Sequence, residues 1–302
     1  MNICLMGSVS SSWTTLNALS GAGIEVTAVL GVRPDKAKRV SDYRDLEPLA
    51  HEVGVPYLGF GRVSEREVTA FIDEHPADML WVIGLSQLVP ARILDRFPAG
   101  GVGFHPTLLP MGRGRAPVAW TLLLGARAAV NLFYLTDDAD AGDIIIQREV
   151  PVLPDDYAED LIDRTNAVLH QCVSDLAPQI LAGNLPRNPQ DHSRATHYEK
   201  RTPEDGLICW ADPTDRIYRL VRAAGRPYPG AFTRLGDRRL IIWRARPEGF
   251  VRTGIPGTVL AVEKESLVIE TADGALRTTD AEWNTEPLPV AVGTTFDWEP
   301  TP

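Results

Sequence analysis

The chain has 302 residues, of which 44% are hydrophobic, and its formal net charge is −10. No apolar run approaches the roughly 20 residues that span a bilayer, and the opening MNICLMGSVSSSW lacks the basic and long apolar segments of a signal peptide. The negative charge argues against broad nucleic-acid binding, and three widely spaced cysteines, Cys4, Cys172 and Cys209, indicate reduced thiols and a cytoplasmic protein.

The first part of the chain alternates short apolar segments with helical patterns. Buried strands are predicted at 2–7, 26–32, 78–84, 102–105, 129–135 and 143–150. Helices are predicted after the first strand through about residue 20, and at 45–53, 68–75, 118–125 and 157–181. This alternation predicts an α/β fold, a Rossmann-like and mostly parallel sheet with helices on both faces. The segment MGSVSS after the first strand holds one glycine, so the dinucleotide fingerprint GxGxxG is absent.

The second part of the chain changes character after a polar stretch, NLPRNPQDHSRATHYEKRTPEDG, which predicts a linker or a wrapped loop. A helix is predicted at 214–224, followed by short alternating strands with Gly and Asp turns that are typical of a small, OB-like β-barrel. We therefore expect a large domain at 1–185, a linker at 186–204 and a small C-terminal β domain at 205–302.

The stretch GFHPTLLPMGRGRAP places His105 at the predicted carboxyl end of a parallel strand. Ligands of open α/β sheets bind outside those strand ends. Pro106 and Pro110 stiffen the turn that follows, and general acid–base catalysis requires rigid placement of a titratable group. The plainer alternative is a histidine packed at a strand end with both nitrogens satisfied.

The segment TDDADAGDIII, residues 136–146, carries four acids around a glycine turn between two apolar strands. The functional interpretation places Asp140 near His105, because a carboxylate beside an imidazole orients the ring and stabilises its cationic form. The alternative is an ordinary acidic hairpin. The calcium-loop pattern D-x-D-x-D-G is missing from the segment, and the sequence predicts no metal site.

With HPTLLP, GRGRAP and DADAGDIIIQ in this order, the chain resembles the formyltransferase family that uses N10-formyltetrahydrofolate. Past the polar stretch, TPEDGLICW, IYRLVRAAGRPYPGAFT and PGTVL resemble the C-terminal half of methionyl-tRNA formyltransferases and, equally, of enzymes that formylate nucleotide-linked amino sugars. The resemblance covers nearly the whole chain. It implies a catalytic domain at 1–185 and formyl transfer from N10-formyltetrahydrofolate to an amine.

The resemblance also implies roles for individual residues. His105 is expected to move protons and to help stabilise the developing oxyanion, and Asp140 to orient and charge the histidine. The pterin of the cofactor is expected at the loop after the 78–84 strand, where main-chain groups would read its edge. That loop contains Leu85, Ser86, Gln87, Leu88 and Val89. An ordinary strand-to-helix connection capped by Ser86 is the alternative.

Gly103 departs from the family pattern, which has an asparagine there whose amide holds the formyl oxygen. Loss of one oxyanion donor typically lowers a rate by about 10²–10³-fold. Three interpretations stay open. A water or another side chain, with Asn131 as one candidate, replaces the donor; the vacant corner admits a different acyl group or a larger nucleophile; or the protein binds folate or a sugar nucleotide without catalysing transfer.

The composition bears on the acceptor. Residues 205–302 hold 12 basic and 14 acidic residues, and the chain lacks the longer basic insertion in which the tRNA enzymes resemble one another. We therefore expect a small or nucleotide-linked amine. Nine arginines from Arg216 to Arg246 keep tRNA open as an alternative, because arginine clusters bind phosphate.

The loop that follows His105 supplies the expected acceptor-binding residues, which are Arg113, Gly114 and Arg115. The alternative is that both arginines only brace the loop. Tryptophans of the C-terminal part are expected to fill the barrel core rather than stack on a base, and they are Trp210, Trp243 and Trp283. No membrane partner is expected, and a homodimer is compatible with the sequence.

Overall fold

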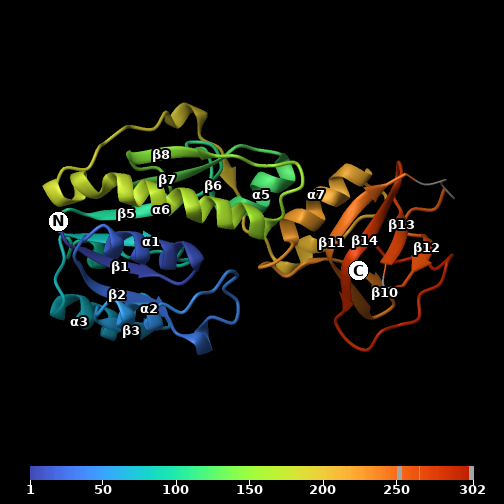
Figure 1. The fold of residues 1–302 in the computed structure, drawn as a ribbon, viewed down its shortest axis with the longest axis horizontal. Helices are drawn as coiled ribbons and strands as arrows, with labels where there is room; N and C mark the ends of the chain where they lie inside the picture. Colours follow the sequence, from blue (N-terminus) through green and yellow to red (C-terminus); the bar gives the residue numbers. More distant parts are fainter. Residues whose placement is uncertain (250–253, 265, 299–302) are drawn as a thin grey trace. The chain divides into compact units, whose positions relative to one another are not determined.

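The computed structural model describes residues 1–249, 254–264 and 266–298, which form two compact units (Figure 1). The first unit comprises Met1–Pro117, Arg127–Pro151 and Ile162–Glu199. The second comprises Val118–Ala126, Val152–Leu161 and Lys200–Pro302. Among the helices of the described residues, none has both the length and the apolar character needed to cross a membrane.

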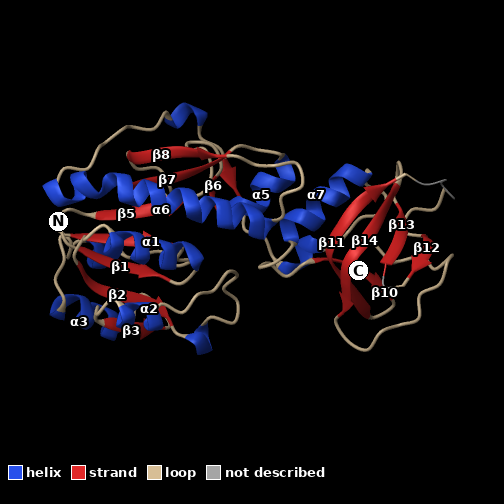
Figure 2. Cartoon of the chain, viewed as in Figure 1, coloured by secondary structure: helices blue, strands red, loops and turns tan. Residues whose placement is uncertain are grey.

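A seven-stranded sheet forms the centre of the first unit (Figure 2). Its strand order is β3-β2-β1-β4-β5-β7-β8. The strands are β1 (Ile3–Gly7), β2 (Val26–Val32), β3 (Tyr57–Phe60), β4 (Met79–Ile83), β5 (Gly101–His105), β7 (Ala128–Tyr134) and β8 (Ile144–Val150). Strands β3 through β5 in that order pair in parallel, whereas β7 is antiparallel to both β5 and β8. The predicted mostly parallel sheet is confirmed.

Apolar residues at alternating strand positions hold the helices of the first unit against the sheet. These helices are α1 (Ser10–Gly21), α2 (Glu47–Glu52), α3 (Arg66–Glu74), α4 (Ala91–Leu94) and most of α6 (Ala158–Ala182). Val68 and Ile72 of α3 pack with Ile93 of α4 in one buried cluster. Cys4 and Met6, two residues apart on β1, face the same cluster, as a strand period of two requires. This cluster packs α3 and α4 against the sheet.

Residues expected to form a linker, 186–204, instead wrap onto the first unit over much of their length. Asn188 exchanges two main-chain hydrogen bonds with Ile144 at the start of β8, at 2.8 and 3.0 Å. Further along, β9 (His197–Tyr198) pairs in parallel with β6 (Arg113–Gly114). A short 3₁₀ turn, His192–Arg194, lies between these two contacts. Of the two interpretations of this polar stretch, the wrapped loop is the one that the structure supports.

The second unit is built on a five-stranded antiparallel sheet in the order β10-β11-β14-β13-β12. Its strands are β10 (Ala231–Leu235), β11 (Arg238–Glu248), β12 (Val259–Glu263), β13 (Ser266–Glu270) and β14 (Ala275–Trp283). Residues 293–297 bond to both edge strands: the Val259 N–H donates to the Thr294 carbonyl, and the Asp297 N–H donates to the Arg234 carbonyl, each at 2.8 Å. This segment closes the sheet, which confirms the predicted small barrel.

Helices and buried aromatic side chains complete the second unit, which contains α5 (Pro117–Leu124) from Val118 onward and α7 (Thr214–Ala224). Trp210 is fully buried in the barrel core, and its indole N–H donates to Thr233 Oγ1 at 2.9 Å. Trp283 packs against the same core. Trp243 does not: its indole N–H donates to Glu282, and the Arg226 guanidinium lies over its ring. The expectation of a core role is correct for Trp210 and Trp283 and wrong for Trp243.

Replacing Trp210 by alanine should lower the free energy of unfolding of the second unit by about 3–5 kcal/mol, because a large buried side chain leaves a cavity. Chemical denaturation followed by circular dichroism measures the change. Trp243→Ala is the matched control and should lower it by less than half as much, because that ring is only partly buried. Equal losses in the two variants would contradict the assignment of Trp210 to the core.

Candidate active site

His105 is the last residue of β5, at the carboxyl end of the parallel strands. Its ring is almost fully buried, with 4% of the residue exposed. Nε2 lies 2.7 Å from the Gly112 carbonyl oxygen, and Nδ1 lies 3.5 Å from Asp140 Oδ2. Both ring nitrogens therefore face oxygen acceptors, so a proton on either nitrogen has a partner that can hold it.

Asp140 reaches the histidine from the loop that joins β7 to β8. Its backbone lies in the left-handed region, with φ at 54°, a conformation that aspartate tolerates better than most residues. The same oxygen that faces His105 accepts a hydrogen bond from the Gly114 N–H at 2.8 Å, and the side chain is 18% exposed. The expected proximity of Asp140 to His105 is confirmed.

Two amide side chains, one buried on β7 and one exposed on β8, fix the turn after His105. Asn131 lies opposite His105 on β7 and is completely buried. Its Nδ2 donates to the carbonyls of His105, at 2.7 Å, and of Thr107. Gln147 on β8 donates to Asn131 Oδ1 at 2.6 Å and to the Leu109 carbonyl at 2.9 Å. The suggestion that Asn131 replaces the missing oxyanion donor is wrong, because its amide hydrogens are already bound to the turn.

The place of a side chain at Gly103 is already filled. A Cβ atom there would lie 2.7 Å from Phe133 Cζ and 2.8 Å from Leu135 Cδ2, closer than real Cβ atoms approach other carbons. Phe133 pairs directly with Gly103 across β5 and β7, and it is buried. The interpretation of a vacant corner is therefore wrong: apolar atoms of β7 occupy the position that an amide would need.

Of the expected acceptor-binding residues, Arg113 braces the loop and Arg115 is exposed. Arg113 is 5% exposed, and its Nη2 contacts Gln190 Oε1 at 2.7 Å and His192 Nδ1 at 3.3 Å. Arg115 has an exposed side chain, its main-chain N–H donates to the Tyr198 carbonyl at 3.0 Å, and no ion pair holds its guanidinium within the described part of the chain. Gly114, with φ at 104°, allows the close approach of its amide to Asp140.

The loop after β4, where the pterin is expected, contains both packed and exposed residues. Leu85 and Val89 pack against the first core, while Ser86 and Leu88 are exposed. Gln87 is bound elsewhere: its side chain accepts from the Val63 N–H and donates to the Gly61 carbonyl, each at 3.0 Å. Helix α4 begins after Pro90, so Ser86 is not its cap. Within the described ranges, no hydrogen bond engages the main-chain groups of residues 85–89.

The contribution of residues 188–198 to this site has no counterpart in any sequence motif. Gln190 donates to the carbonyls of Asp140, at 2.9 Å, and Gly142, at 2.8 Å. Thr196 Oγ1 accepts from the Gly112 N–H at 2.8 Å. The sequence of this segment is a mixture of polar residues, and such a composition is equally typical of a linker. Only the fold shows that this segment contacts both loops around His105.

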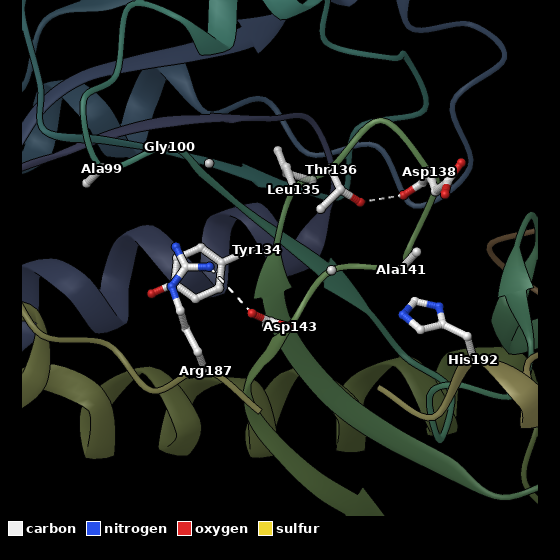
Figure 3. A pocket seen from close by; sticks show the side chains of 12 residues that line it. Ala99, Gly100, Tyr134, Leu135, Thr136, Asp138, Ala141, Asp143, Arg187 and His192 are labelled. Carbon is white, nitrogen blue, oxygen red and sulfur yellow. Dashed lines mark hydrogen bonds and ion pairs between the residues drawn. The ribbon is translucent and has the colours of Figure 1, made fainter. Parts of the chain in front are cut away.

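A pocket of about 400 Å³ lies against the loop that carries Asp140 (Figure 3). Its wall includes Leu135, Thr136, Asp138 and Asp143 from that loop and its ends. Figure 3 shows Arg187 over the Tyr134 ring, with an ion pair from Arg187 to Asp143 at 3.5 Å. Neither His105 nor the 85–89 loop lines this pocket, so it is not centred on the proposed reacting groups.

Most arginines of the 216–246 stretch are already bound within the second unit. Their partners are Asp212 for Arg216, Asp215 for Arg219, Asp280 for Arg226, Glu204 for Arg234 and Arg239, Glu159 for Arg244, and main-chain carbonyls of Asp156 and Glu286 for Arg222 and Arg238. Pairing with acids cancels the charge that a phosphate surface needs. Among the described residues, no three His, Cys, Asp or Glu side chains converge as a metal site would require.

A buried histidine faced by a loop aspartate lies at the carboxyl end of a Rossmann-like sheet, where ligands of open α/β sheets bind, and a small barrel follows in the chain. Residues 1–176 match the formyl transferase family, and residues 200–289 match the formyl transferase C-terminal domain. The chain therefore belongs to the formyl transferase family.

Solved structures share the fold at low sequence identity. HypX from Aquifex aeolicus in complex with tetrahydrofolic acid is 21% identical with a TM-score of 0.69, covering 94% of this chain, which spans only 44% of HypX. An N-formyltransferase from Helicobacter canadensis, complexed with folinic acid and dTDP-3-aminofucose, is 14% identical with a TM-score of 0.66 (93% and 99% covered). Methionyl-tRNA formyltransferase from Clostridium thermocellum is 19% identical with a TM-score of 0.59 (94% and 98% covered).

Introducing asparagine at Gly103 should lower the free energy of unfolding by about 1–3 kcal/mol without raising turnover, because the side chain overpacks against Phe133 and Leu135. Chemical denaturation and a formyl-transfer assay measure the two effects. The matched control is Gly21→Asn at the end of α1, where a Cβ meets nothing within 4 Å. Gly103→Asn with full stability and faster turnover would show that the corner accepts an amide.

Proposed function

We propose that the protein transfers a formyl group from N10-formyltetrahydrofolate to the amine of a small or nucleotide-linked amino sugar. The observation that carries this proposal is the buried His105–Asp140 pair, 3.5 Å apart, in a chain of the formyl transferase family. A titratable ring at a rigid strand end, with a carboxylate beside it, is the arrangement that proton transfer during acyl transfer needs.

His105 handles the proton at Nε2. That nitrogen lies 2.7 Å from the Gly112 carbonyl, which marks the side of the ring where the proton is exchanged. Asp140 remains at Nδ1, where its carboxylate orients the ring and stabilises the doubly protonated form. The Gly114 N–H, 2.8 Å from the same carboxylate oxygen, keeps Asp140 in place while the ring charges.

The 85–89 loop fits the formyl donor. Its main-chain N–H and C=O groups have no hydrogen-bond partner among the described residues, and an exposed strand-end loop with free main-chain groups can bind the polar edge of a pterin ring. Gln87 ties the loop to Gly61 and Val63 through its side chain. The donor would supply the formyl group and the amine the proton that the leaving nitrogen gains, while the protein carries that proton and orients the reactants.

Apolar packing at Gly103 removes the amide that the family pattern has for the developing oxyanion. Stabilisation of the negative charge on the formyl oxygen then depends on the proton of His105. Removal of one oxyanion donor typically lowers a rate by about 10²–10³-fold. We therefore infer slow turnover with weakly nucleophilic amines. This reasoning also favours a tightly held acceptor, since binding energy can offset a weakened oxyanion site.

Two observations favour a small acceptor over tRNA. Arg115 is exposed beside the Asp140 contact and has no ion-pair partner within the described chain, so it suits a single anionic group such as a diphosphate. Most arginines of the 216–246 stretch are bound to acids or main-chain carbonyls, and the net charge of the chain is −10. The Helicobacter canadensis enzyme, which shares the fold, was crystallised with a nucleotide-linked amino sugar.

Release of tetrahydrofolate, followed by absorbance, tests the proposal with N10-formyltetrahydrofolate and a panel of nucleotide-linked amino sugars, simple amines and methionyl-tRNA. His105→Ala should reduce turnover by about 10²–10⁴-fold because it removes the proton-transfer group. Arg115→Ala should mainly raise the KM of an anionic acceptor. Unchanged turnover in His105→Ala would contradict the proposed mechanism, and activity only with tRNA would contradict the proposed acceptor.

A further inference from the structure

We propose that residues 188–198, here called the strap, are part of the active site and that Gln190 is the positioning residue for Asp140. This inference rests on the proposed function. The strap lies between the two segments that match the formyl transferase family, 1–176 and 200–289, so its own residues belong to neither matched segment. Four lines of contact support the assignment.

The Gln190 side chain is buried and uses both ends of its amide. Its Nε2 donates to the carbonyls of Asp140 and Gly142, at 2.9 and 2.8 Å, while Oε1 accepts from Arg113 Nη2 at 2.7 Å. An amide has two donor hydrogens and a carbonyl oxygen, so it satisfies both sides at once. Neither a carboxylate nor an apolar side chain of similar size could do so.

These contacts hold the residue that faces His105. Gln190 donates to the main-chain carbonyl of Asp140 itself. The backbone of Asp140 is left-handed, with φ at 54°, so this hydrogen bond holds the conformation in which the carboxylate faces His105. The carbonyl of Gly142, two residues on, is held by the same nitrogen. The direction of the carboxylate therefore depends on a segment 50 residues away in the sequence.

Loss of the Gln190 side chain would leave the buried guanidinium of Arg113 without one of its hydrogen-bond acceptors. The Arg113 side chain is buried, and a buried charge is tolerated only when acceptors surround it. Gln190 Oε1 and His192 Nδ1 are the two acceptors that face its Nη2. Arg113 thus anchors the strap, and the strap in turn holds the Asp140 loop.

The other end of the strap holds the loop that faces the second ring nitrogen. Thr196 Oγ1 accepts from the Gly112 N–H at 2.8 Å, and the Thr196 carbonyl accepts from the Arg113 N–H at 2.9 Å. The carbonyl of Gly112 is the partner of His105 Nε2. One continuous segment therefore fixes the acceptors on both sides of the catalytic ring.

Gln190→Glu is the variant of choice, because it keeps an acceptor for Arg113 and removes the N–H donors to the Asp140 loop. The Gly114 amide reports the result, since its N–H donates to Asp140 Oδ2. Hydrogen exchange of this amide should become about tenfold faster in Gln190→Glu, as expected for a weakened hydrogen bond. Ser174→Ala, whose hydroxyl bonds to the His170 carbonyl within α6, is the control and should leave the exchange unchanged. This readout requires no turnover.

The kinetic test is a double-mutant cycle. Gln190→Glu should lower kcat by about 10–100-fold, the scale of a small misplacement of a catalytic group, with the KM of the amine little changed. In an Asp140→Ala background it should cause no further loss, because the residue that it positions is gone. Losses that multiply in the double variant, or Gly114 exchange equal to that of the unmodified protein, would overturn the inference. Absence of formyl transfer by the unmodified protein would overturn the proposed function, and the exchange experiment would still decide the role of Gln190.

Discussion

Two oxygen acceptors from separate loops converge on the His105 ring, and the architecture of the first unit serves to keep them there. The Gly112 carbonyl faces Nε2 at 2.7 Å, and the Asp140 carboxylate faces Nδ1 at 3.5 Å. Strand β5 fixes the ring, since it is paired on both sides, with β4 and with β7. Loops alone are the most mobile parts of a fold, so each acceptor needs its own support.

That support comes from three amide side chains, on β7, β8 and the strap. Asn131 and Gln147 hold the turn after His105 from beneath, through the carbonyls of His105, Thr107 and Leu109. Gln190 holds the Asp140 loop from the strap. Neutral amides suit this task because they both donate and accept without adding charge next to a group that must gain and lose a proton.

Much of this arrangement could be predicted from the sequence, and the failures have physical causes. Apolar periodicity located the strands at 102–105 and 129–135, and motif order brought His105 and Asp140 together. Strand β9 was missed because two residues carry no periodic signal. The roles of Asn131 and Gln190 were not foreseen, since an amide on a strand or in a polar stretch gives no sign of which distant carbonyl it binds.

The filling of position 103 by Phe133 and Leu135 restricts how this site can change over evolutionary time. An asparagine at 103 would overpack against the Phe133 ring, so a lineage that gains the asparagine is expected to gain a smaller or shifted side chain at 133 as well. A small side chain at 133 with glycine still at 103 would leave a cavity near His105, which is costly in a well-packed interior. The two positions are therefore coupled, and a substitution that is beneficial in one background is harmful in the other.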